Sequence, residues 1–272
     1  MQRGLARKRT AFQEDRVTMP LSDVRHTFLV EQVTTRGRVQ VADCAARLQV
    51  SQETVRRDLR ALELQGLLRC IYGGAVLQHS SASADRPLSE RIRLNPNEKA
   101  QVARLAAGQV GAARSIFLDA STTVLALARQ LVGRTDLAVT TNSLEVAILL
   151  GGAVGEVMVT GGTVRPIDNA LVGHAAVAFV RSQMFDLSFM GAASVDLEHG
   201  FMDFGSEESA LRQALREHST RCALLLDSSK FGRTARLRTF PLDAVPLLIT
   251  NRAPPPPFAA RFKALGVEVL HG

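Results

Sequence analysis

The sequence predicts a two-domain protein of the α/β class, with a small helical domain at the N-terminus and a larger, mostly parallel α/β domain after it. Two closely spaced helical patterns followed by a glycine turn predict the small domain. Short apolar runs that alternate with helical stretches from residue 115 onward predict the large domain. The length of 272 residues suits one large and one small domain.

Four segments are expected along the chain. Residues 1–20 are basic and hold few apolar positions, so we expect a mobile tail there. The small domain covers residues 21–77, and a polar linker rich in small residues covers 78–96. The large domain covers 97–272.

The formal net charge is +7, and most of the excess lies in the first third of the chain. Residues 1–80 hold 13 basic and 8 acidic side chains, a net +5, whereas residues 81–272 hold 20 and 18, a net +2. A basic patch attracts phosphate through salt-sensitive contacts. The small domain is therefore the part expected to bind nucleic acid.

Three cysteines lie far apart and show no spacing typical of metal ligands: Cys44, Cys70 and Cys222. We interpret them as reduced packing residues and expect no metal and no cofactor. No apolar run reaches the ~20 residues that would cross a bilayer, and the N-terminus lacks the apolar core of a signal peptide. We therefore expect a cytoplasmic protein with no membrane partner.

The small domain is expected to begin with a helix over about residues 21–37. Its apolar face consists of Val24, Phe28, Leu29 and Val33. A short helix follows at 41–48 and ends in a tight turn before Ser51, a good N-cap residue. A third helix begins there, and its buried stripe consists of Val55, Leu59 and Leu62.

This third helix carries polar groups that suit the major groove of DNA. The candidates for contact with bases and phosphates are Gln52, Thr54, Arg56, Arg57 and Arg60. An ordinary solvated helix would show similar charges. The short helix before it, the stop at Gly66 and a hairpin after it favour DNA recognition instead.

The hairpin is expected over residues 67–77, around Gly73 and Gly74. It would form a wing, with Arg69 and Tyr72 placed to contact the DNA backbone. Helices followed by such a hairpin are typical of a winged helix-turn-helix. The predicted partner is therefore double-stranded operator DNA.

The motif VSQETVRRDLRALELQGLLR, followed by YGGA, resembles the signature of the DeoR family of bacterial sugar-metabolism regulators. Two positions depart from that signature: Val55 stands for Ile, and Tyr72 for the His before the paired glycines. The pair Arg25-His26 resembles the RH pair that opens the family's first helix. The resemblance implies a DNA-binding regulator.

The large domain is expected to open with a helix from about Asn97. The apolar runs IFLD, LAVTT, VMVT, LSFMG, CALLLD and PLLIT then predict strands. Helices are expected from Thr122, from Ser143 and over about 207–218. Such alternation predicts a mostly parallel sheet covered on both faces.

In such sheets a ligand binds beyond the carboxyl ends of the strands. The polar residues and glycines that follow the predicted strands are Asp119, Ser121, Thr122, Thr123, Asn142, Gly161, Gly162, Arg165, Asp227 and Lys230. Hydroxyls at a helix N-terminus, a close backbone approach at paired glycines and two cations suit a phosphate ester. The carboxylates and the amide suit sugar or polyol hydroxyls. Each segment alone is also typical of ordinary caps and turns, but all of them fall on one edge.

The same region resembles the family's effector-binding domain, which is similar in fold to ribose-5-phosphate isomerase. The matching motifs are DASTT, TTNS, GGxxR, FxG and DSSKFG. Two residues depart from the pattern: Arg212 stands for a usual Lys, and Ser194 for a frequent Gly. A further match, R-x-x-x-N-x-x-E-K, is interpreted as a set of domain-joining contacts by Arg91, Asn95, Glu98 and Lys99.

Three late features are similar to the family's glycerol-3-phosphate repressors: Gly200, the run Met202-Asp203-Phe204 and the prolines of residues 253–257. The resemblance implies that the effector is a phosphorylated sugar or polyol such as glycerol-3-phosphate.

Two functions of different classes follow. The first is a repressor of a carbohydrate or polyol operon, with no catalytic residue, that the effector releases from its operator. The second is a phosphosugar isomerase-like enzyme that transfers protons through Asp119, Asp203, Glu208 or Asp227 with Lys230. Fusion to a DNA-binding domain favours the repressor. Because operators usually match a two-fold axis of the protein, we expect a homodimer or homotetramer.

Overall fold

The computed structural model describes residues 22–64, 68–77 and 86–272. Contacts divide the chain into two compact units, residues 1–77 and 78–272, each of which is described by itself. The expectations for the N-terminal tail and for Gly66 lie outside the described residues. Within the described ranges, no helix is long and apolar enough to cross a membrane.

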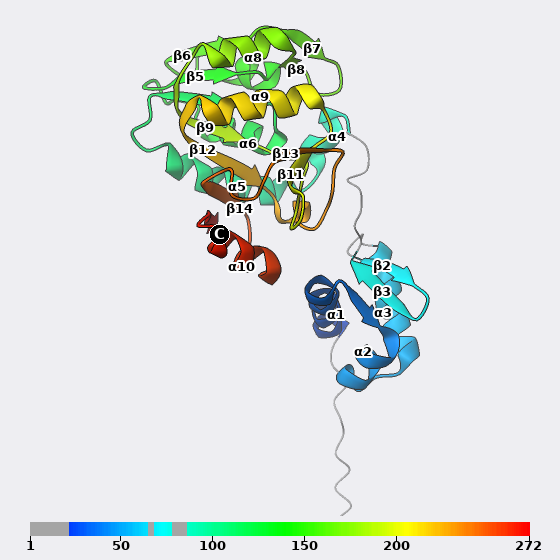
Figure 1. The fold of residues 1–272 in the computed structure, drawn as a ribbon. Coiled ribbons are helices and arrows are strands. Elements are labelled where there is room, and N and C mark those ends of the chain that lie inside the picture. The colour runs from blue at the N-terminus through cyan, green and yellow to red at the C-terminus, as the bar shows by residue number, and fades with distance from the viewer. Residues whose placement is uncertain (1–21, 65–67, 78–85) are drawn as a thin grey trace, which may run out of the picture. The chain divides into compact units, whose positions relative to one another are not determined.

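The first unit contains the three predicted helices and the predicted hairpin (Figure 1). The helices are α1 (Ser22–Arg36), α2 (Val41–Leu48) and α3 (Gln52–Leu64). The hairpin consists of β2 (Leu68–Ile71) and β3 (Gly74–Leu77). The winged helix-turn-helix predicted from the sequence is thereby confirmed.

One strand of this unit was not predicted. β1 (Arg38–Gln40) pairs antiparallel with β3, which gives the sheet order β1-β3-β2. Three residues are too few for an alternating pattern to stand out. The pairing depends on Gly74, because a Cβ atom there would lie 1.9 Å from the carbonyl oxygen of Val39.

The apolar stripes of α1 and α3 meet in a small core. Leu29, Val33, Val55 and Leu59 are each at most 1% exposed. Val24 is 57% exposed, so its predicted place on the apolar face of α1 is wrong. It lies in the first turn of α1, and the buried contacts of this helix begin one turn later.

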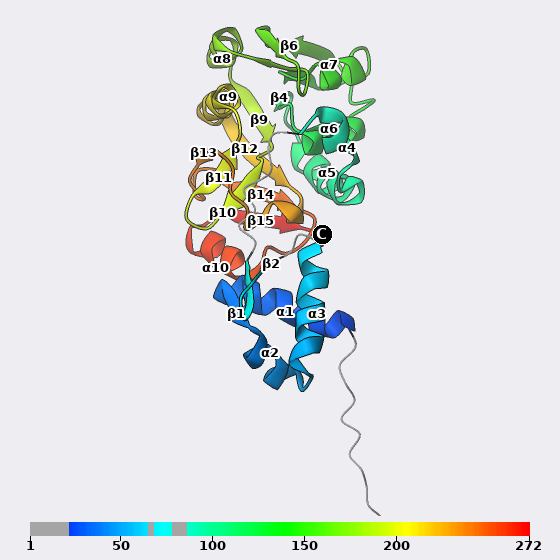
Figure 2. The same ribbon diagram turned by 90° about the vertical axis from the view of Figure 1, so that its right-hand side faces the viewer.

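The second unit is built on a seven-stranded parallel sheet of order β15-β14-β12-β9-β4-β5-β6. Its strands are β4 (Ser115–Leu118), β5 (Ala138–Thr141), β6 (Glu156–Val159), β9 (Phe185–Met190), β12 (Ser219–Leu226), β14 (Leu247–Thr250) and β15 (Glu268–His271). Figure 2 shows helices on both faces of this sheet, so the predicted class is confirmed.

Each face of the sheet has its own core. One core is covered by α5 (Pro96–Val110), α6 (Thr122–Gln130) and α7 (Leu144–Leu150). The other is covered by α8 (His174–Arg181), α9 (Ser206–Glu217) and α10 (Pro256–Ala264). Ile116 and Phe117 are adjacent on β4, and their side chains pack into opposite cores. This follows from the two-residue period of a strand.

Several short elements of this unit were not predicted. They are β15, the hairpin of β7 (Thr163–Arg165) and β8 (Ala170–Val172), the small sheet of β10 (Ser194–Asp196), β11 (Gly200–Asp203) and β13 (Leu237–Phe240), and the helices α8, α10 and α4 (Leu88–Arg93). The last of these lies inside the predicted linker, 78–96. Residues 78–85 of that linker lie outside the described residues.

The sheet has one topological switch point. From β4 the chain moves outward through β5 and β6, and then returns to place β9 on the other side of β4 before it continues to β12, β14 and β15. Ligands of open α/β sheets bind at the carboxyl ends of the strands that flank such a point. A ligand is therefore expected at the edge formed by the carboxyl ends of β4 and β9.

Candidate DNA-binding and effector sites

The N-terminal end of α3 is built around Ser51. Its Oγ accepts the backbone N–H of Thr54 at 3.1 Å and lies 2.9 Å from the Thr54 hydroxyl, so the predicted N-cap is present. Thr54 was proposed as a DNA contact. Its hydroxyl is engaged with Ser51, which makes it a group that shapes the start of the helix.

The arginines of α3 differ in their surroundings. Arg56 donates to the side chains of Gln52 at 3.1 Å and Glu53 at 3.4 Å. Arg57 and Arg60 are exposed, and neither pairs with a carboxylate among the residues that the structure describes. These two guanidinium groups are therefore open to solvent.

Asp58 fixes the position of α3, a role that the sequence analysis did not assign. The residue is 5% exposed, and its carboxylate accepts hydrogen bonds from Arg25 at 2.7 and 3.1 Å. The Nε2 atom of His26 lies 3.2 Å from the same carboxylate. Hydrogen bonding to Asp58 raises the pKa of Arg25. The Arg25-His26 pair thus holds the face of α3 opposite its exposed arginines.

The wing places Tyr72 at its tip, where the side chain is fully exposed. In the sheet register, Arg38 faces Val76 and Val76 faces Arg69, so the two arginines lie in one row on the same face. Both are exposed. Arg38 therefore extends the basic surface of the wing, and the sequence missed it because β1 is so short.

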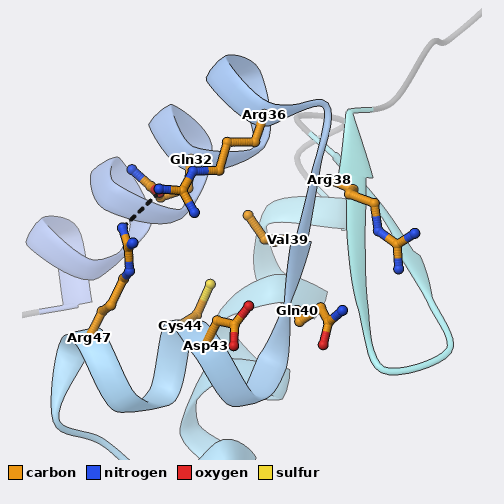
Figure 3. Close-up of a pocket in the computed structure, with 8 residues that line it drawn as sticks. All are labelled: Gln32, Arg36, Arg38, Val39, Gln40, Asp43, Cys44 and Arg47. Atoms are coloured by element: carbon orange, nitrogen blue, oxygen red, sulfur yellow. Dashed lines mark hydrogen bonds between the residues drawn. The ribbon is translucent and has the colours of Figure 1, made fainter.

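A basic pocket lies beside the wing, between α1, β1 and α2 (Figure 3). Three arginines line it against one carboxylate: Arg36, Arg38 and Arg47 against Asp43. Arg47 points across the pocket to α1 and donates to the Gln32 side chain at 3.3 Å. This cluster accounts for part of the positive charge that the sequence places in the small domain.

In the second unit, the sheet brings the predicted effector-binding segments to one edge. These segments follow β4, β5, β6, β9 and β12, and those five strands are consecutive in the sheet. Hydroxyls, glycines, carboxylates and cations therefore line neighbouring strand ends.

The N-terminus of α6 lies at the switch point. The Oγ of Ser121 accepts the N–H of Thr123 at 3.2 Å, as a helix cap does. Gly191, at the end of β9, packs so closely that a Cβ atom there would lie 2.4 Å from Ser121 Oγ. The paired glycines after β6 adopt positive φ angles, +71° at Gly161 and +111° at Gly162.

A buried guanidinium lies beneath this edge. Arg212 of α9 is 3% exposed and forms ion pairs with Asp119 at 2.8 Å, Asp203 at 2.5 Å and Glu208 at 2.8 Å. Burial lowers the pKa of Arg212, but the three carboxylates outweigh burial and raise it well above its ordinary value. The group is therefore permanently charged.

This cluster bears on the isomerase alternative. Three of the four carboxylates that an isomerase would use for proton transfer, Asp119, Asp203 and Glu208, are paired with Arg212. The fourth, Asp227, accepts hydrogen bonds from Asn95 and Ser229. Asp119 also accepts the N–H groups of Ser121 at 2.8 Å and Gly191 at 2.9 Å. Asp119 was predicted to hold a polyol hydroxyl, but both of its oxygens already accept internal hydrogen bonds.

Arg165 joins this network from the end of β7. Its guanidinium donates to Asp168, at 2.9 Å from Nε, and to Glu208 at 3.4 Å. Asp168 is 1% exposed. Burial raises the pKa of this carboxyl, but the bonds and charge of Arg165 and the charge of Arg91 overcome burial and lower it.

Lys230 lies in the turn Ser228–Lys230 that follows β12. Burial lowers the pKa of its ammonium group, and the attraction of Asp227 opposes that shift. No hydrogen bond of Lys230 Nζ occurs among the described residues. Its charge is therefore held at the strand ends without an internal partner of its own.

Two buried amides at the same edge have one atom without a hydrogen-bond partner in the described part of the chain. They are Oδ1 of Asn142, after β5, and Nδ2 of Asn251, after β14. The other amide atom of Asn251 accepts the N–H of Ser228 at 2.7 Å. Asn251 was not predicted, because a single amide after the last apolar run carries no distinctive pattern.

No group of three or more metal-ligating side chains occurs among the described residues. The arrangement consists instead of a helix N-terminus, cations and buried amides, which are groups that bind anions and hydroxyls.

A winged helix-turn-helix joined to an α/β domain whose strand ends carry polar groups is typical of a transcriptional regulator that senses a small molecule. The model of the DeoR-like helix-turn-helix domain matches residues 25–81, and the model of the DeoR C terminal sensor domain matches residues 94–252. The chain therefore belongs to the DeoR family. One of its domains binds DNA and the other senses a small-molecule effector. The protein is a regulator and not an enzyme.

Curated relatives cover most of the chain. The glycerol-3-phosphate regulon repressor of Escherichia coli is 31% identical over 233 residues, which cover 85% of this chain and 91% of the relative. The regulator GlpR of Haloferax volcanii is 31% identical over 90% of this chain and 95% of its own length. The repressor CsqR of Escherichia coli is 30% identical over 90% and 94%.

Solved structures are more distant. Ribose 5-phosphate isomerase A of Methanocaldococcus jannaschii is 18% identical with a TM-score of 0.37, over 50% of this chain and 55% of that one. The delta subunit of eIF2B from Chaetomium thermophilum is 16% identical with a TM-score of 0.41, over 60% and 57%. At these TM-scores, neither match supports a statement about this chain's activity.

Proposed function

We propose that this protein represses a carbohydrate or polyol operon and that a phosphorylated sugar or polyol, such as glycerol-3-phosphate, releases it from its operator. The observation that carries the proposal is the switch-point edge, where the N-terminus of α6 follows β4, Arg165 lies in the segment after β6 and Lys230 follows β12. An anion bound there gains from backbone N–H groups, the helix dipole and the two cations.

The residues at this edge would divide the work by chemistry. The backbone N–H groups and hydroxyls of Ser121, Thr122 and Thr123 would hold the phosphate, and Lys230 would neutralise its charge. The unpaired Oδ1 of Asn142 suits a donor such as a polyol hydroxyl. Asp119 would act indirectly, because it orients Ser121 and Gly191 through their N–H groups.

On DNA, α3 would enter the major groove with Arg57 and Arg60 foremost, and the wing would contact the backbone through Arg69 and Tyr72. We propose a homodimer or homotetramer, because a two-fold operator requires two such helices. Since its proposed partner is operator DNA, we propose that the protein works in the cytoplasm.

An operator titration tests the proposal. The protein selects its own duplex from a random library, and binding to that duplex is then measured with and without glycerol-3-phosphate and a panel of sugar phosphates. We expect one phosphorylated compound to weaken operator binding and to raise the melting temperature, because it binds the folded sensor domain. Equal effects of inorganic phosphate and of the whole panel would contradict a specific effector site.

A further inference from the structure

The segment through which the chain enters the sensor domain, residues 88–95, is here called the entry segment. It contains α4 and Asn95. Its contacts reach the loops that carry Arg165 and Lys230, the cations of the proposed effector site.

The first of these loops follows β7. The backbone N–H of Leu88 donates to the carbonyl of Ile167 at 2.9 Å. Arg91 Nη1 lies 3.3 Å from Oδ2 of Asp168, the buried carboxylate that also pairs with Arg165. One carboxylate is therefore shared between the effector site and the entry segment.

The second loop follows β12. Asn95 Nδ2 donates to Asp227 Oδ1 at 3.2 Å and to Ser229 Oγ at 3.0 Å. Both acceptors belong to the loop that carries Lys230, and Ser229 N–H itself donates to Asp227 at 3.0 Å. Asn95 adopts a positive φ of +49°, a conformation that asparagine and glycine tolerate best.

Lys99 ties the two ends of the entry segment to one helix. It is 6% exposed in the first turns of α5, and its Nζ donates to the carbonyls of Arg91 and Leu94, the latter at 2.7 Å. Arg91 carries one of these carbonyls, and Asn95 directly follows the residue that carries the other. The ammonium group of Lys99 therefore links the two anchors. A displacement of the backbone at one anchor should therefore displace the backbone at the other.

We infer that the entry segment transmits effector binding from the sensor edge toward the DNA-binding domain, with Arg91 and Asn95 as positioning residues. A bound anion would draw Arg165 away from Asp168 and rearrange the loop of Lys230. It would thereby change the contacts of Asp168 and Asp227, the two carboxylates that hold the entry segment. The chain leads from this segment back to the small domain. The inference rests on the proposed function and names the regulation of the same site.

The test compares Arg91→Ala and Asn95→Gly with a matched control, Arg93→Ala. Glycine at position 95 removes the amide but keeps the positive φ without strain. Arg93 is an exposed residue of the same helix, without an ion-pair or hydrogen-bond partner among the described residues. Two affinities are measured for each variant, the first for the selected operator duplex and the second for glycerol-3-phosphate or the panel compound that releases the wild type.

The quantity of interest is the coupling ratio, the operator affinity without the compound divided by that with it. Ratios of about 5 to 150 are typical of coupled sites. We expect Arg91→Ala and Asn95→Gly to bind duplex and compound but to move the ratio toward 1. Arg93→Ala should keep the wild-type ratio. Melting temperatures confirm folding, and Arg91→Lys is the milder variant if Arg91→Ala fails to fold.

The outcomes separate the two proposals. If the wild type responds and both variants keep its ratio, the entry segment does not transmit and only the inference falls. If a variant loses affinity for the compound itself, its residue belongs to the binding site and the positioning role is overturned. If no phosphorylated compound of the panel releases the wild type, the proposed function fails, and the inference fails with it.

Discussion

Single buried charges hold both functional surfaces of this protein in position. Asp58 fixes α3 through Arg25 and His26, and Arg212 gathers three carboxylates beneath the sensor edge. Both residues are buried. The exposed Arg57 and the half-buried Lys230 depend on this support, since the side chains beneath a site determine how precisely its residues are placed.

Arg57 is expected to contact a base or a phosphate of the operator. Replacing Arg57 with Ala should weaken operator binding by about 1 to 3 kcal/mol and relax the sequence preference at one position if it reads a base. Binding to operator variants, measured at fixed salt, checks this. Equal weakening for every sequence, with a shallower salt dependence, would make Arg57 a phosphate contact instead.

Asp58 is expected to be more important for stability than its place among surface arginines suggests. Replacing Asp58 with Ala removes the acceptor of two hydrogen bonds from Arg25 and should lower the free energy of unfolding of the small domain by about 2 kcal/mol. Urea unfolding followed by circular dichroism measures this. The exposed Asp43 is the control, and its replacement with Ala should cost about 0.5 kcal/mol or less. Similar losses for both variants would contradict the supporting role of Asp58.

Lys99 should make the free energy of unfolding depend on pH in the alkaline range. Burial lowers the pKa of Lys99 from 10.5 to about 8 in the folded protein. Between these values the unfolded chain binds this proton more tightly, so the stability of the wild type should rise relative to Lys99→Met as pH increases from about 8 to 10.5. Urea unfolding of both proteins across that range measures the difference. A constant difference would mean that Lys99 titrates alike in both states.

At the scale of elements, the short strands decide the geometry of both sites. β1 completes the wing sheet and brings Arg38 into a row with Arg69. β7 and β8 place Arg165 beside Asp168. α4 converts part of a polar stretch into a segment held by two sensor loops. Elements of three to six residues therefore add contacts that the long, periodic elements do not provide.

The pairing of β1 with β3 gives an element-scale prediction. Replacing Gly74 with Ala would place a Cβ atom 1.9 Å from the Val39 carbonyl, so β1 must separate from the wing. We expect a loss of operator affinity of tenfold or more and a lower melting temperature. The control is Gly108→Ala in α5, where the new Cβ meets nothing within 4 Å and should stabilise the helix by about 0.5 to 1 kcal/mol. Full operator binding by Gly74→Ala would show that β1 is dispensable for the wing.

At the scale of the whole molecule, reading DNA and sensing a ligand belong to separate compact units. Each unit has its own core, and the links that we propose between their functions pass through one stretch of chain. We expect such an arrangement to allow one function to be removed while the other remains, because each unit contains buried apolar clusters of its own.

Lys230 provides the test of that separation. Replacing Lys230 with Ala should leave operator affinity without effector unchanged, within about twofold, and should abolish release by the effector. The measurement is an operator titration with and without the releasing compound. The chain has one tyrosine and no tryptophan, so the intrinsic fluorescence of Tyr72 at the wing tip reports DNA contact in the same samples. Unchanged release would remove Lys230 from the effector site.

The sequence by itself determined the long elements and their order. The stripe Val55, Leu59 and Leu62, the cap at Ser51 and the alternating apolar runs are local patterns, and the structure contains the helices and strands that they predict. Because parallel strands align their carboxyl ends, these patterns also sufficed to place the candidate effector residues on one edge.

Only the tertiary structure decided which polar groups are already paired. Asp119 is occupied by Arg212 from 93 residues away, Asp58 by Arg25 from 33 residues away, and Asn95 reaches Asp227 across 132 residues. Such pairs leave no periodic trace, since each depends on how distant elements pack and not on its neighbours in the chain. The sequence therefore determined where the candidate sites lie, and packing decided which of their side chains are paired within the protein.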